Sequence, residues 1–440
     1  PTEADALTEA GALEAAALAE TDALEADAHK AGPLAETGAL AQAGTPTQAG
    51  ALAEARALRT AFALLSGEPA SLPASRLPAR DSYDAVVSPA RRARAQWLLA
   101  YGLFNAGDLA AAEELTARAL AGFRAIGDRW GIAASLGRRA QHAVIRGDLA
   151  ALRRDGEHSA ALFRELGDRW GQLQSVAPLA SLAEFNGEYE RAARIHHEGL
   201  RIAEELGLGA EIAARLSGLG RLALLTGGPD RARDLHERAR RRAAEQGYRF
   251  GEIHAELGLA LGARRSGDLA TAERYLLRIR DWYAEVSSEA GNSLVLAELG
   301  FVAEQRGDPA RARALHLDGL AVARAVGDPR AVALAVEGLA GAESLAGRPA
   351  RAALLLGAAS AARRDAGAPL PPAERGDVDR IAAAVRDARG VRAYDEAFVR
   401  GERLGMEAAL AEWPEQPSAP GAPHGGGPHG GGPAPQGACV

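Results

Sequence analysis

Residues 127–171 read GDRWGIAASLGRRAQHAVIRGDLAALRRDGEHSAALFRELGDRWG, so the pentapeptide GDRWG returns after forty residues. Glycine also stands midway between the two copies. The same step continues along the chain, where glycine occupies thirteen of the fourteen positions at twenty-residue steps from 107 to 367, and only Ser287 breaks the series. This period predicts near-equal helices, of which two form a forty-residue unit, with seven units in a row. Such arrays usually bind other molecules rather than catalyse reactions.

The residues that follow these glycines indicate how each helix ends and the next begins. Aspartate follows glycine directly at Asp108, Asp148, Asp268 and Asp308. Glycine adopts the left-handed conformation that ends one helix, and the aspartate carboxylate accepts from the free N–H groups of the next. Proline takes the first helical position, where no N–H is needed, at Pro89, Pro229, Pro309 and Pro349.

The composition favours helix throughout the chain. Alanine, leucine, arginine and glutamate dominate, and no long alternating run of valine, isoleucine, threonine or tyrosine predicts a strand. Cys439 is the only cysteine, which excludes a disulfide within the chain and a thiolate metal site. No segment has the length of an apolar membrane span or the pattern of a secretory signal, so we expect a cytoplasmic protein.

The net charge of −7 is unevenly distributed. Residues 1–58 carry ten acidic and two basic residues, so the rest of the chain sums to +1. A nearly neutral array argues against a bulk electrostatic grip on nucleic acid. Direct nucleic-acid binding by the array is therefore a weaker hypothesis. Salt-dependent binding to duplex DNA by the isolated repeats would revive it.

Shifts in composition divide the chain into five parts. We expect a low-complexity linker at 1–58, a degenerate repeat or irregular segment at 59–92, the repeat array at 93–366, capping helices at 367–413 and a disordered Pro/Gly/His tail at 414–440. Since the chain begins with Pro1 rather than methionine, we expect a fragment or a processed product. Pro178 falls inside a predicted helix and should kink it.

Small residues recur seven positions before every second glycine of the series, counted from Gly107. They are Ala100, Ala140, Ala180, Gly220, Ala260, Gly300 and Ala340. With the Gly-Asp turns and the alanines that follow them, they resemble the tetratricopeptide repeat, in a forty-residue form with longer helices. The resemblance implies an all-α, right-handed α-solenoid of about seven helix hairpins with a C-terminal helical cap. The first helix of each hairpin would line its concave face.

Longer stretches resemble the C-terminal repeat region of large actinobacterial transcriptional regulators, the Streptomyces antibiotic regulatory protein type and its relatives with a switch ATPase. They are LGDRWG at 166–171, LAELGFVAEQRGD at 296–308, GDPRAVAL at 327–334 and, most specifically, GAPLPPAER at 367–375. The resemblance implies a sensor or regulatory arm that binds a protein or peptide, or the ATPase and DNA-binding parts of the same regulator. Neither part is predicted here. The only lysine, Lys30, lies in no phosphate loop, and no helix-turn-helix is evident. The alternative is a free-standing scaffold or peptide receptor unrelated to transcription.

Several side chains need weighing as sites. His196 and His197 suggest a metal site, but adjacent histidines on a helix diverge, so we interpret both as residues of an exposed helix. Trp130 and Trp170 are stacking platforms or, more simply, packing between repeats. The basic run at 238–242 has interleaved acids and is interpreted as a solvated face. His424 and His429 lie in the tail. No catalytic set, cofactor site or metal site is predicted, and we expect no enzyme.

The family's groove offsets, applied to this register, select ten residues on the first helices. They combine aromatic, amide and charged groups, which suits a peptide or a protein segment. The candidates are Trp97, Tyr101, Asn105, Gln141, Gln174, Glu184, Arg221, His254, Arg264 and Arg265.

Overall fold

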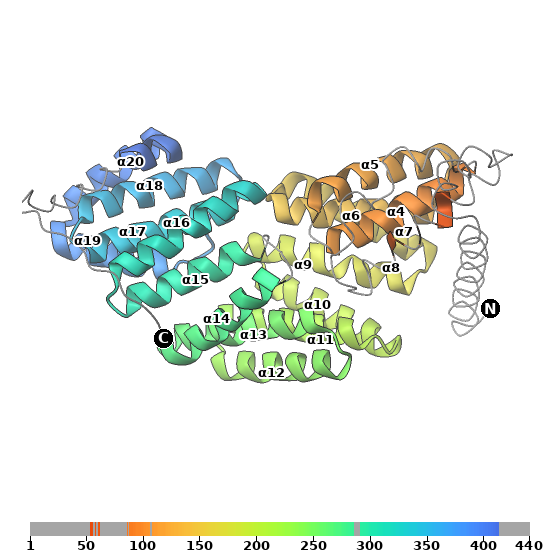
Figure 1. The fold of residues 1–440 in the computed structure, drawn as a ribbon, viewed down its shortest axis with the longest axis horizontal. Helices are drawn as coiled ribbons and strands as arrows, with labels where there is room; N and C mark the ends of the chain where they lie inside the picture. The colour runs from red at the N-terminus through yellow and green to blue at the C-terminus, as the bar shows by residue number, and fades with distance from the viewer. Residues whose placement is uncertain are drawn as a thin grey trace, which may run out of the picture.

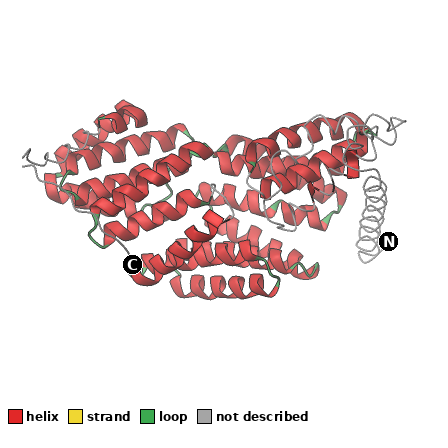
Figure 2. Ribbon diagram, viewed as in Figure 1, coloured by secondary structure: helices red, strands yellow, loops and turns green. Residues whose placement is uncertain are grey.

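The computed structural model describes residues 53–55, 58, 60, 61, 86, 88–105, 108–285 and 291–412. Within these residues every regular element is helical (Figure 2). In chain order the elements are α4 (Pro89–Asn105), α5 (Leu109–Ile126), α6 (Arg129–Arg146), α7 (Leu149–Leu166), α8 (Arg169–Gln174), α9 (Val176–Phe185), α10 (Tyr189–Glu205), α11 (Gly209–Leu225), α12 (Pro229–Glu245), α13 (Arg249–Arg265), α14 (Leu269–Glu285), α15 (Asn292–Gln305), α16 (Pro309–Val326), α17 (Pro329–Leu345), α18 (Pro349–Asp365), η3 (Pro372–Glu374), α19 (Gly376–Arg389) and α20 (Val391–Ala411). No described helix is both long and apolar enough to cross a lipid bilayer.

Consecutive helices pack in pairs and form seven hairpins. The pairs are α4 with α5, α6 with α7, α9 with α10, α11 with α12, α13 with α14, α15 with α16, and α17 with α18, numbered here as hairpins 1 to 7. The first helix of hairpin 3 is divided into α8 and α9 at Ser175, three residues before Pro178. Proline lacks the N–H that would continue the helical bonding, so the expected interruption is confirmed. The all-α solenoid of seven hairpins is confirmed as well.

The turns between helices have the geometry that their residues predict. Twelve glycines of the series have φ between 62° and 84°, the left-handed region, while Gly107 lies outside the described residues. The Asp148 carboxylate accepts from the N–H of Ala151 at 2.9 Å, and that of Asp308 accepts from the N–H of Arg311 at 3.0 Å. α7 and α16 therefore each start from a capped N-terminus directly after the previous helix stops.

Histidines fill the seams between successive hairpins. Position 316 and its equivalents at forty-residue steps on the second helices are buried, as His196, His236, Leu276, His316 and Leu356. The His316 ring, fully buried, enters between Gly300 and Gly338, where an added Cβ would lie 2.5 and 2.0 Å from its atoms. Glycine is needed at these two positions because the ring takes the space of a side chain.

The array closes on itself. The Arg146 guanidinium, at the end of α6, donates to the Val326 carbonyl at 2.7 Å, and Arg330 at the start of α17 donates back to the Val144 carbonyl at 2.5 Å. Figure 1 shows the end of α16 meeting the N-terminal hairpins near the middle of the molecule. Hairpin 2 therefore contacts the junction of hairpins 6 and 7.

The last helix covers hairpin 7. α20 packs closely along α18, because Gly357 and Gly401 face the partner backbone at their crossing. A Cβ at Gly357 would lie 2.0 Å from the Phe398 carbonyl oxygen, and one at Gly401 would lie 1.9 Å from that of Leu354. Two glycines thus permit a backbone contact that any larger residue would prevent.

Candidate functional site

The C-terminal segment 371–380 lies against the first helices of the hairpins. We call the face of those helices that it contacts the inner surface. Three positions of the segment, each three residues apart, form ion pairs with hairpins 4, 5 and 6 in order. The pairs are Glu374 with Arg221, Asp377 with Arg264, and Arg380 with Glu304. The segment therefore follows the repeat axis, with one ion pair for each of these hairpins.

Arg264 makes the most deeply buried of these contacts. Only 4% of Arg264 is exposed. Its Nε donates to Glu298 at 2.5 Å, while Nη1 and Nη2 donate to the two oxygens of Asp377 at 3.0 and 2.9 Å. Burial opposes ionisation of Asp377, but the Arg264 charge and its hydrogen bonds outweigh it, so the pKa of this carboxyl lies below its ordinary value. The planar guanidinium thus joins the segment to α15 through two carboxylates.

Glu184 and Arg221 form a second ion pair on the inner surface. The buried Glu184 carboxylate accepts from Arg221 Nε at 2.7 Å and lies 3.7 Å from His196 Nε2. Burial disfavours its charge, yet the His196 hydrogen bond and the Arg221 charge together hold the pKa of Glu184 below its ordinary value. Arg221 Nη2 also reaches Glu374 at 3.5 Å, so this pair holds the beginning of the segment.

The structure thus brings three predicted groove residues together, namely Glu184, Arg221 and Arg264. His254 and Arg265 lie exposed on α13. The sequence did not identify Glu374 and Asp377, the partners of Arg221 and Arg264, because the C-terminal segment was expected only to cap the array.

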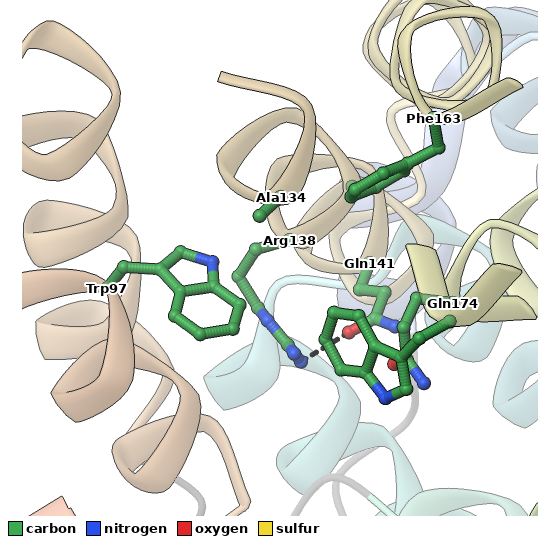
Figure 3. A pocket seen from close by; sticks show the side chains of 8 residues that line it. Trp97, Ala134, Arg138, Gln141, Phe163 and Gln174 are labelled. Carbon is green, nitrogen blue, oxygen red and sulfur yellow. Dashed lines mark hydrogen bonds between the residues drawn. The ribbon is translucent and has the colours of Figure 1, made fainter. Parts of the chain in front are cut away.

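A second cluster lies on hairpins 1 to 3, and Figure 3 labels four of its members, Trp97, Arg138, Gln141 and Gln174. We call it the Arg138 cluster; it consists of Trp97, Tyr101, Arg138, Gln141, Trp170 and Gln174. The Arg138 guanidinium carbon lies 3.9 Å from the Tyr101 ring centroid, and Nη1 donates to Gln141 Oε1 at 2.5 Å. The rings of Trp97 and Trp170 meet edge-on at 6.4 Å. Between them is a cleft of about 10 Å³, which holds about one water molecule.

Repeat equivalence places this cluster on the inner surface too. Tyr101 and Gln141 occupy the position of Arg221 in their own hairpins, at forty-residue steps. Arg138 occupies the position of Glu298, the carboxylate that pairs with Arg264. Trp97, Tyr101, Gln141 and Gln174 were predicted from the sequence. The side chain of Asn105, at the end of α4, lies outside the described part of the chain.

Arg138 was missed, although the sequence holds a signal for it. The equivalent position elsewhere in the array is Pro178, Gly218, Gly258, Glu298 or Gly338. Three of these are glycines, and at each an added Cβ would lie 2.0 to 2.2 Å from a buried histidine ring. An arginine at a position that is glycine in three other hairpins indicates that the first helix of hairpin 2 makes different side-chain contacts there.

The remaining sequence candidates have structural roles. Trp130 stacks on Trp170 at 6.1 Å and donates through Nε1 to Asp168 at 2.5 Å, which is packing between repeats. The interpretation of His196 as exposed was wrong, because its ring is buried against Gly218, whereas His197 is exposed. The burial follows from the seam position that His196 shares with His236.

The basic run on α12 is interleaved with acids, as predicted. Arg238 pairs with Asp234, and Arg242 with Glu245. In the part of the chain that the structure describes, no group of three or more histidine, cysteine, aspartate or glutamate residues has the arrangement of a metal site. His424 and His429 lie outside that part.

Comparison with known proteins gives a likeness of fold only. No protein-family model and no curated protein sequence matches the chain. Among solved structures, a Rap protein complexed with Competence and Sporulation Factor is similar at 15% identity and a TM-score of 0.47, over 68% of this chain and 88% of that chain. BtubC from P. vanneervenii is similar at 22% identity and 0.38, over 50% and 91%. A signal-transduction ATPase with a tetratricopeptide repeat sensor from Pyrococcus horikoshii is similar at 15% identity and 0.40, over 70% of this chain and about half, 52%, of that one.

Proposed function

We propose that this chain is a protein-interaction module whose inner surface binds an extended or helical segment of a partner protein. One observation carries the proposal, namely that the chain's own segment 371–380 already lies there with one ion pair for each of three successive hairpins. A surface that holds one peptide through spaced side-chain contacts is suited to hold another. Among the described residues no ion pair joins hairpin 1 or 2 to that segment, and these two hairpins carry most of the Arg138 cluster.

The proposal extends to the role of the module. The stretch at 367–375 and the Gly-Asp turns resemble the repeat region of actinobacterial transcriptional regulators. We therefore propose a sensor or regulatory arm, whose partner is a protein segment or the switch ATPase of the same regulator. The sequence of the parent gene tests this extension. A phosphate loop and a DNA-binding domain encoded upstream would support it, whereas their absence would leave a free-standing peptide receptor.

Binding itself is tested with a fluorescein-labelled peptide that copies residues 369–384, mixed with the full chain. We expect saturable fluorescence anisotropy that weakens with salt, because the contacts are ion pairs. A peptide of the same composition in scrambled order is the control, since it loses the three-residue spacing. Equal binding of the two peptides, or none of either, would show that the inner surface is not a peptide site.

A further inference from the structure

Four arginines of the described chain are more than nine-tenths buried, and one of them differs from the rest. They are Arg138, Arg215, Arg264 and Arg363, with exposed fractions of 4 to 8%. Arg264 pairs with Glu298 and Asp377, Arg363 pairs with Glu337, and Arg215 lies 3.4 Å from Glu211. Among the described residues, Arg138 has no carboxylate within ion-pair distance.

The contacts of Arg138 compensate its charge only in part. The Gln141 amide oxygen accepts from Nη1, and the rings of Tyr101 and Phe104 lie 3.9 and 5.3 Å from the guanidinium carbon. Its Nε–H is buried and has no hydrogen-bond partner among the described residues. The Arg138 charge also acts on His142, because burial and then this charge lower the pKa of His142 to about 4.

We infer that Arg138 binds a side-chain carboxylate of the partner segment in the cleft that Trp97 and Trp170 line on hairpins 1 to 3. This inference rests on the proposed function, whose site it makes specific for an acidic residue. The inner surface shows its preferred chemistry at Arg221 and Arg264, which hold the carboxylates of Glu374 and Asp377. Among the buried arginines that the structure describes, Arg138 is the one that lacks a carboxylate partner.

The geometry defines how the carboxylate enters. The cleft has room for only about one water molecule, so the incoming oxygens replace the Gln141 amide oxygen on the guanidinium. Gln141 and Gln174 then face the partner's backbone, and their amides can donate and accept hydrogen bonds there. Trp97 and Trp170 line the same cleft, and Figure 3 shows Trp97 beside the Arg138 side chain.

The test uses the full chain, the labelled peptide 369–384, and a second peptide in which Glu374→Gln, Asp377→Asn and Asp379→Asn remove all three side-chain carboxylates. We expect Arg138→Gln to weaken binding of the acidic peptide on the order of tenfold or more, since a charge-assisted hydrogen bond is lost. The peptide without side-chain carboxylates should bind the variant and the wild type equally. Arg153→Gln, on the exposed face of α7, is the matched control and should change neither.

A stability measurement separates binding from folding. Removing a buried cation without a carboxylate should leave the unfolding midpoint unchanged or raise it, whereas Arg264→Gln, which strands two carboxylates, should lower it. If Arg138→Gln binds the acidic peptide as tightly as wild type, or lowers the midpoint as much as Arg264→Gln, the inference is overturned while peptide binding stands. If the wild type binds neither peptide, the proposed function fails as well.

Discussion

Replacing the fully buried His316 by leucine should change how stability depends on pH. Burial lowers the pKa of this histidine from 6.5 to about 3, so the folded chain keeps the ring neutral where the unfolded chain protonates it. Stability from this group is therefore complete above pH 6.5 and is lost progressively as the pH falls toward 3. Between pH 7 and pH 5 the loss is about 2 kcal/mol, the free energy of protonating the unfolded histidine at pH 5.

Leucine suits the site because the equivalent residues Leu276 and Leu356 are buried in the same seams. It has a similar volume and removes two ring nitrogens that have no hydrogen-bond partner among the described residues. At pH 7 we expect the free energy of unfolding to change by less than about 1.5 kcal/mol, as for other volume-conserving exchanges. Between pH 7 and pH 5 the free energy of unfolding should fall by about 2 kcal/mol less in the variant than in the wild type.

The assay is urea unfolding at pH 7 and pH 5, followed by circular dichroism, on wild type and variant. Other buried histidines titrate as well, among them His236, whose pKa burial lowers to about 4, so the comparison is between proteins rather than between pH values alone. His158→Leu, on the exposed face of α7, should keep the wild-type difference. If His316→Leu loses as much stability as the wild type between the two pH values, the ring is protonated in the folded chain and the reasoning is refuted.

Two further variants test the seams and the segment. Gly338→Ala should lower the free energy of unfolding by about 1 to 3 kcal/mol, because the new Cβ would lie 2.0 Å from the His316 ring; an unchanged urea midpoint would mean that the ring moves freely. Asp377→Asn should speed hydrogen exchange in residues 372–389 about tenfold, since Arg264 loses one of two carboxylates, while exposed Asp379→Asn should not; equal exchange in both would show that the segment is held by other contacts.

Local chemistry made the hairpins predictable. A glycine with positive φ followed by a capping aspartate ends one helix and starts the next within two residues, so the turn at Gly147-Asp148 could be predicted without any tertiary knowledge. Likewise Pro178 interrupts its helix because of a missing N–H. These features depend on residues that are neighbours in sequence.

The position of the C-terminal segment could not be predicted in the same way. Where 371–380 lies depends on the small rotation between successive hairpins, summed over several of them, and no local motif records that sum. The same rotation brings Arg146 to the Val326 carbonyl across 180 residues. The offsets selected Arg221 and Arg264 as groove residues, but their partners, Glu374 and Asp377, belong to a segment that sequence patterns assign only to a cap.

The comparison of two equivalent positions explains why Arg138 points to a ligand rather than to packing alone. At Glu298 the preceding first helix offers Arg264, and the two charges neutralise each other. At Arg138 that helix offers the rings of Tyr101 and Phe104, whose attraction for a cation is about 0.5 to 2 kcal/mol. Removing an ion from water costs several kcal/mol even after relaxation, which the rings do not offset. No carboxylate among the described residues pairs with Arg138. A carboxylate from a partner would therefore offset part of the free energy that removing the Arg138 charge from water costs, and this gain would contribute to binding rather than to folding.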